Sequence, residues 1–142
     1  MLEKTDLSPT AVRCLDRQLA EALDLAVWCY HLSDPARCDG DRLMVVVLER
    51  LASDLTDLAG AIVPLVGDHG GTIPPLPAHP SSRTDTWVAQ LDDDLRQVGM
   101  VARLDAMTPG LETSVVRLLS KIAALYQSSR ELLLTSLGRA GA

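Results

Sequence analysis

The chain has 142 residues, of which 47% are hydrophobic and 23% are charged, and it carries a net charge of −6 at pH 7. This length suits one domain, and the composition is that of a soluble globular protein. The negative charge argues against nucleic acid as the main partner, because proteins that bind it gather lysine and arginine on one face.

The first predicted helix covers about residues 9–33. Ser8 and Pro9 supply an N-cap and a proline at the first helical position. Apolar residues then recur at spacings of three and four from Val12 to Cys29, which is the stripe of an amphipathic helix. Pro35 follows the expected end, because the residue before a proline avoids the α region.

The second predicted helix covers about residues 41–66 and has the most regular apolar stripe. The stripe consists of Met44, Leu48, Leu51, Leu55, Leu58 and Ile62. Residues 68–83 follow it as a linker, with four prolines and two glycines in sixteen residues. Such a composition is typical of a stiff, extended connection.

Two further helices are predicted, over about residues 85–107 and 109–137. The third carries apolar residues from Val88 to Ala102, and Thr108 with Pro109 repeats the start signal of the first helix. Gly138 is the expected stop of the fourth helix.

Four amphipathic helices of this length predict an all-α, single-domain four-helix bundle. The short connections after the first and third helices predict two antiparallel hairpins. An up-down-up-down order is favoured. The middle linker, however, could extend about 50 Å at 3.1 Å per residue, so a crossover along the whole bundle remains an alternative.

The cysteines and the first ten residues indicate the compartment. Cys14, Cys29 and Cys38 are odd in number and share no motif spacing, which favours reduced thiols over a disulfide framework. The segment MLEKTDLSPT lacks the features of a signal peptide, and no apolar run is long enough to cross a bilayer. We therefore expect a cytoplasmic protein that makes no membrane contact.

Residues 25–38, LAVWCYHLSDPARC, concentrate rare side chains in one short stretch. Cys29, His31 and Cys38 are soft metal ligands, but zinc needs a fourth ligand in tetrahedral geometry. On a helix, Cys29 and His31 point about 200° apart at 100° per residue. We interpret the stretch as a helix end and expect no metal and no cofactor.

The same stretch predicts an interface on the outer face of the first helix. If Leu19 marks the centre of the core face, Tyr30 is buried, and Leu25, Trp28 and Leu32 form an apolar line that meets solvent. Such a line favours self-association or a protein partner. Cover by the linker and packing inside the bundle are the alternatives.

A second set of residues predicts a polar cluster at the middle of the bundle. Asp54, Asp94 and Lys121 each lie about 60° from the core direction of their helices. They form either ordinary salt bridges, which we favour, or the polar end of a ligand pocket. Tyr30, Trp87 and Tyr126 are the aromatic residues that would line such a pocket.

One resemblance bears on function. The segments LERLASDLTDLAGAIVPLV, QLDDDLRQVGMVARLD and VVRLLSKIAALYQSSRELL resemble small all-helical proteins of unknown function that are encoded in natural-product biosynthesis clusters of high-GC bacteria. The resemblance spans about residues 43–137. It implies an accessory role in secondary metabolism.

The sequence thus predicts a bacterial helical interaction protein without catalytic residues, which binds a partner or a second copy of itself to form a homodimer. We find no arrangement of Ser, Cys, His and acid that would support nucleophilic catalysis. The alternative is a small-molecule-binding bundle or a small cofactor-free enzyme, with a pocket between the helices.

Overall fold

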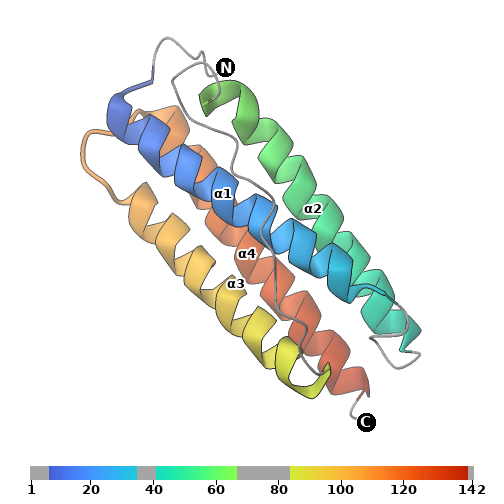
Figure 1. Cartoon of the computed structure of the whole chain (residues 1–142). Coiled ribbons are helices and arrows are strands. Elements are labelled where there is room, and N and C mark those ends of the chain that lie inside the picture. Colours follow the sequence, from blue (N-terminus) through green and yellow to red (C-terminus); the bar gives the residue numbers. More distant parts are fainter. Residues whose placement is uncertain (1–6, 35–40, 67–83, 141–142) are drawn as a thin grey trace.

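The computed structural model describes residues 7–34, 41–66 and 84–140, with side chains described over 89–136 in the last range. These residues form four helices, which are α1 (Pro9–Leu32), α2 (Arg42–Val66), α3 (Thr84–Ala106) and α4 (Thr113–Ala140). They pack side by side as a bundle, and no strand occurs in the described ranges (Figure 1). The predicted all-α four-helix bundle is confirmed.

Polar caps set the ends of α1. The Ser8 side chain accepts a hydrogen bond from the backbone N–H of Ala11 at 3.2 Å, and Pro9 begins the helix. At the other end, the N–H of Ser33 donates to the carbonyl oxygens of Cys29 and Tyr30. These caps satisfy backbone groups that a helix end leaves without partners.

The fourth helix begins at Thr113, four residues after the predicted start at Pro109. The turn before it contains Gly110, which has a φ of +84° that side chains rarely tolerate. The first hydrogen bonds of the fourth helix run from the N–H groups of Val115 and Val116 to the carbonyl oxygen of Glu112. The proline start signal was therefore misleading, because a tight turn occupies residues 108–112.

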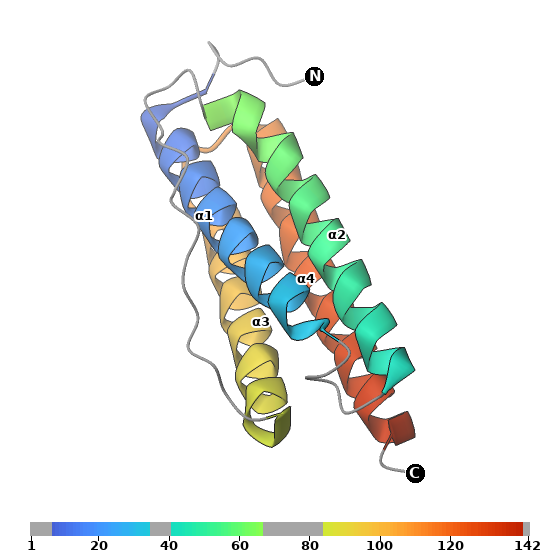
Figure 2. The same cartoon turned by 45° about the vertical axis from the view of Figure 1, so that its right-hand side comes forward.

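The directions of the four helices differ from the favoured up-down-up-down arrangement. Figures 1 and 2 show that α1 and α4 run in one direction and that α2 and α3 both run in the other. The end of α2 and the start of α3 therefore lie at opposite ends of the bundle. Both hairpins are antiparallel as predicted, and the linker between them, residues 67–83, lies outside the described residues.

Helix α1 is buried over about half of its circumference. At 100° per residue, its buried side chains extend from Leu19 on the α2 flank to Trp28 on the α3 flank, which are about 180° apart. The centre of this face lies at Ala22 and Cys29, not at Leu19. The face is wide because α1 has α2 on one side and α3 on the other.

This geometry overturns the predicted outer line of α1. Leu25, Trp28 and Leu32 are core residues, with 1%, 2% and 1% of their surface exposed. Tyr30, which was expected to be buried, is 74% exposed. Centring the core face on Leu19 rotated the prediction by about 80°, enough to exchange the buried and exposed flanks.

A close approach between α3 and α4 occurs at Gly99. A Cβ at this position would lie 3.3 Å from Cβ of Tyr126, so the small residue lets the two helices meet. Tyr126 is 1% exposed and is among the largest buried side chains. None of the helices that the structure describes combines the length and apolarity needed to cross a membrane.

We expect Trp28→Ala to lower the free energy of unfolding by about 3–5 kcal/mol, because it empties a packed core position. Tyr30→Ala is the matched control and should change it by no more than about 0.5 kcal/mol, because the ring is exposed. Urea denaturation measures both values. Equal effects of the two substitutions would contradict the assigned rotation of α1.

Candidate functional site

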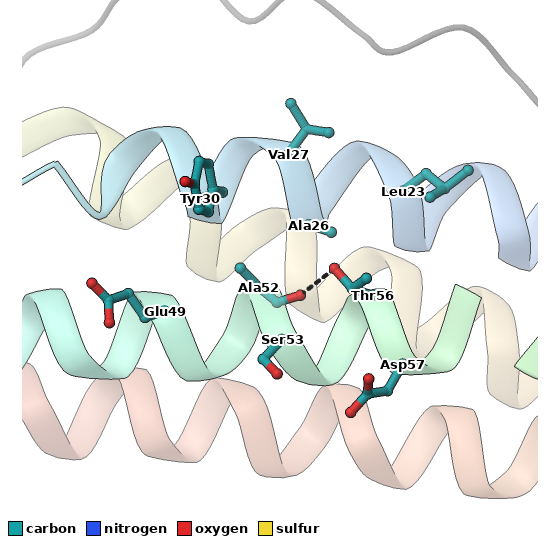
Figure 3. A pocket seen from close by; sticks show the side chains of 9 residues that line it. All are labelled: Leu23, Ala26, Val27, Tyr30, Glu49, Ala52, Ser53, Thr56 and Asp57. Carbon is teal, nitrogen blue, oxygen red and sulfur yellow. Dashed lines mark hydrogen bonds between the residues drawn. The ribbon is translucent and has the colours of Figure 1, made fainter. Parts of the chain in front are cut away.

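A groove of about 660 Å³ lies between α1 and α2 and is open to solvent (Figure 3). Apolar side chains form most of its floor, and polar side chains of α2 form much of its rim. It is lined by Leu23, Ala26, Val27 and Tyr30 of α1, and by Glu49, Ala52, Ser53, Thr56 and Asp57 of α2.

The spacing of residues along α1 builds one wall of the groove. Leu23, Val27 and Tyr30 follow one another at intervals of four and three, so they share one side of the helix. Ala26 and Ala52 face the groove from the two helices, and their small side chains leave its floor open. The apolar side chains on the outer face of the first helix are thus Leu23, Val27 and Tyr30, and not the predicted Leu25, Trp28 and Leu32.

The charged residues that line the groove are both acidic. Glu49 and Asp57 lie toward its two ends and are eight residues apart on α2, which corresponds to about 12 Å along the helix (Figure 3). The hydroxyl of Thr56 donates to the carbonyl oxygen of Ala52 at 2.7 Å and is therefore occupied within its own helix. The groove can hold an apolar surface that carries a positive charge at each end.

The predicted aromatic pocket is not formed. Tyr30 lies in the outer groove, whereas Tyr126 is buried in the core against Gly99. Two residues on opposite sides of a packed helix layer cannot line one cavity. The side chain of Trp87 lies outside the described residues.

The predicted polar cluster is also not formed, because its three members have different surroundings. Asp54 lies 3.9 Å from Nε of Arg50 on the same helix, an exposed pair that contributes little. Asp94 lies near Glu21 of α1, whose pKa it raises. Lys121 is exposed on α4. The register of α3 and α4, in which Asp92 pairs with Arg130 and Gly99 meets Tyr126, also places Asp94 and Lys121 at different heights along the bundle.

A buried carboxylate that the sequence analysis missed joins α3 to α1. Asp105 is 5% exposed and accepts hydrogen bonds from the guanidinium of Arg17 and from Nε2 of Gln18, the latter at 3.1 Å. Gln18 is completely buried, which is unusual for its residue type. Gln18 lies about 100° from Leu19 on the helix, so a core face centred on Leu19 gives no sign of its burial.

The end of the bundle beside Asp105 is held by a second polar contact. The N–H of Ser8 donates to Oε1 of Glu112 at 2.8 Å, which ties the start of α1 to the turn before α4. Hydrogen bonds from the N–H groups of Glu112 itself and Ser8 lower the pKa of the Glu112 carboxyl. We call Asp105, Arg17, Gln18, Ser8 and Glu112 the polar clamp.

A small cavity of about 290 Å³ opens beside the polar clamp. It is lined by Thr10, Arg13, Cys14, Arg17, Asp105 and Thr108. Burial, and then the nearby Asp105 carboxylate, raise the pKa of the Cys14 thiol. Such a thiol is a poor nucleophile at neutral pH.

The cysteine and histidine residues considered as metal ligands, Cys29, His31 and Cys38, do not form a site in the described part of the chain. Cys29 is completely buried, and burial raises the pKa of its thiol to about 12, whereas His31 is exposed. Cys38 lies outside the described residues. Over the described ranges, no group of three or more His, Cys, Asp and Glu residues is placed to hold a metal ion.

Glu21 is a half-buried acid between α1 and α3. Burial raises its pKa, and the neighbouring carboxylates of Asp24 and Asp94 raise it further. Burial also raises the pKa of Tyr126, with a smaller contribution from Glu21. The hydroxyl of Tyr126 has no hydrogen-bond partner among the described residues.

We expect Asp105→Ala to lower the free energy of unfolding by about 1–3 kcal/mol, because the buried amide of Gln18 loses its acceptor. Asp93→Ala is the matched control, since Asp93 also pairs with an arginine, Arg96, but at the surface, and should have little effect. Chemical denaturation measures both. A loss at Asp93 as large as that at Asp105 would contradict the assigned role.

Glu21→Gln should stabilise the protein at pH 7. A folded-state pKa above the unfolded value means that the ionised carboxylate opposes folding at neutral pH, and that this cost disappears once the acid is protonated in both states. The advantage of the variant should therefore shrink as the pH falls through the raised pKa toward 4. Denaturation curves from pH 4 to 8 test this, and a variant less stable at pH 7 would refute it.

Comparison with known proteins adds no functional assignment to this geometry. No family model matches the chain, and no curated protein and no solved structure matches it either. The groove between α1 and α2 and the polar clamp with its small cavity are therefore the features from which a function can be argued.

Proposed function

We propose that this protein is a non-catalytic helical interaction protein, and that its binding surface is the groove between α1 and α2. The partner we propose is a helix with an apolar face and two basic side chains about two turns apart. Binding of this kind lays an amphipathic helix into a hydrophobic groove.

The observation that carries the proposal is the combination of an apolar floor with acidic ends. Leu23 and Val27 are partly exposed, and Tyr30 extends into solvent at one end. Aromatic residues of this kind are common in protein interfaces. Glu49 and Asp57 would attract basic side chains and set the orientation of the partner.

The absence of catalysis is part of the proposal and rests on the chemistry of the described residues. The thiols of Cys14 and Cys29 are buried with raised pKa values, which disfavours the reactive thiolate. His31 lies exposed on α1 and makes no hydrogen bond to a serine or cysteine in the described part of the chain. A nucleophile needs a base within hydrogen-bond reach.

We further propose an accessory role in the cytoplasm of a bacterium, linked to secondary metabolism. This proposal rests on the resemblance of residues 43–137 to proteins of natural-product clusters and on the scattered, odd-numbered cysteines. The genes that neighbour this one test it. Neighbours unrelated to biosynthesis would remove its support.

A small-molecule function is the second candidate. The groove volume of about 660 Å³ falls within the range of small-molecule sites. The same lining would then favour an apolar compound with an amine. A thermal-shift screen with apolar amines tests this second candidate. A partner helix should displace a compound found in this way only if both bind in the groove.

The proposal predicts that a helical peptide of about 16 residues, with leucines on one face and two arginines seven residues apart, binds the protein. Glu49→Gln combined with Asp57→Asn should weaken binding at least about tenfold, because the arginines lose their partners. Isothermal titration calorimetry measures the affinity.

Glu131→Gln combined with Asp54→Asn removes the same charge outside the groove and should leave the affinity unchanged. A second peptide, with glutamines in place of the arginines, should bind the wild-type protein weakly. The proposal fails if the peptide does not bind, or if the control variant weakens binding as much as the groove variant.

A further inference from the structure

Helix α3 and Met107, the first residue after it, expose a line of apolar and basic side chains on the outer side of the bundle. Met100, Leu104 and Met107 are 50%, 60% and 73% exposed. Arg96 and Arg103 lie on the same side of the helix, at spacings of three and four from these residues. We call these five residues the α3 ridge.

We infer that the α3 ridge of a second copy of this chain is the helix that occupies the groove between α1 and α2. The inference rests on the proposed function, since it names the partner of the same groove. A single contact between copies would then cover both exposed apolar surfaces, the groove and the α3 ridge.

The charges of the two surfaces are complementary in sign and spacing. Arg96 and Arg103 are seven residues apart, or about 10.5 Å along α3, and Glu49 and Asp57 are about 12 Å apart along α2. Both arginines are exposed, and Arg96 has an exposed partner on its own helix, Asp93, at 2.8 Å. Surface pairs of this kind are weak and can exchange partners.

The apolar parts of the two surfaces are also matched. Methionine side chains are flexible and adapt to irregular surfaces, so Met100 and Met107 can follow a shallow floor. Ala26 and Ala52 leave room at that floor. The ridge also borders a hollow of about 170 Å³ between α3 and α4, which Arg96, Arg103 and Arg130 line. Two of these arginines have aspartate partners, since Arg96 pairs with Asp93 and Arg130 with Asp92.

The position of the surfaces sets the type of assembly. The α1–α2 pair and the α3–α4 pair form different sides of the bundle (Figures 1 and 2). One copy can therefore offer its ridge to a second copy and its groove to a third. Such head-to-tail contacts make rings or open chains and not an isologous dimer.

Sedimentation velocity tests the inference. The salt concentration should be about 0.15 M, because the Debye length of about 8 Å then limits the repulsion between copies that each carry a net negative charge. The weight-average sedimentation coefficient of the wild type should rise with concentration. Arg96→Glu with Arg103→Glu should weaken association at least about tenfold, and so should Glu49→Arg with Asp57→Arg. Arg117→Glu with Lys121→Glu makes the same charge change on α4 and should leave association intact.

Mixing the ridge and groove variants provides the sharpest test. The ridge variant keeps an intact groove and the groove variant an intact ridge, and the reversed ridge also complements the reversed groove. An equimolar mixture should therefore associate again, although each variant alone does not. A chain with all four exchanges should associate again, which would show that the single-face variants are folded. Circular dichroism of each variant checks its helical content.

The outcomes separate this inference from the proposed function. A wild-type protein that stays monomeric while its groove binds the basic peptide would overturn the inference and leave the proposed function standing. Failure of both assays would overturn both. Association that survives in the ridge variant alone, or an equimolar mixture of the two variants that does not associate, would also overturn the inference.

Discussion

The buried carboxylate of Asp105 is the interaction on which the placement of the two hairpins depends. It lies at the end of α3, and its donors Arg17 and Gln18 lie in the first half of α1. Burying a carboxylate without such donors costs several kcal/mol. If α3 ran the other way, Asp105 would lie at the far end of α1. The carboxylate therefore favours the topology in which α2 and α3 are parallel, and the contact between Ser8 and Glu112 holds the same end of the bundle.

This placement determines which surfaces remain outside. Because α1 is covered by α2 on one flank and by α3 on the other, its second half buries Leu25, Trp28 and Leu32. The apolar side chains of α1 that lie outside this buried face, on the side of α2, then meet solvent beside Glu49 and Asp57. They are Leu23, Val27 and Tyr30. Helix α3 is in turn oriented with its basic and apolar ridge away from the core. One set of packing contacts thus produces both an acidic groove and a basic ridge.

The helices could be predicted from sequence because caps and apolar stripes are local signals. Ser8 with Pro9 marks the start of α1, and the stripe of α2 is buried except at Leu58, which is partly buried. The candidate site could not be predicted, because it depends on which part of a wide apolar arc faces outward. A helical wheel gives angles between residues but no absolute orientation, so Trp28 and Tyr30 were exchanged. Gln18 and Asp105 were missed because neither residue type marks a buried position unless its partner is known.

The direction of α3 relative to α2 tests this account most directly. Electron spin resonance can measure distances from a spin label at Ala61 of α2 to labels at Leu104 and Gln90 of α3, which are exposed and about 21 Å apart along that helix. Replacing Cys38 with serine leaves the buried Cys14 and Cys29 as the other cysteines, and dilution with unlabelled protein suppresses spin–spin interactions between different copies. The parallel arrangement predicts that the distance from Ala61 to Leu104 is the shorter of the two. A shorter distance from Ala61 to Gln90 would contradict it.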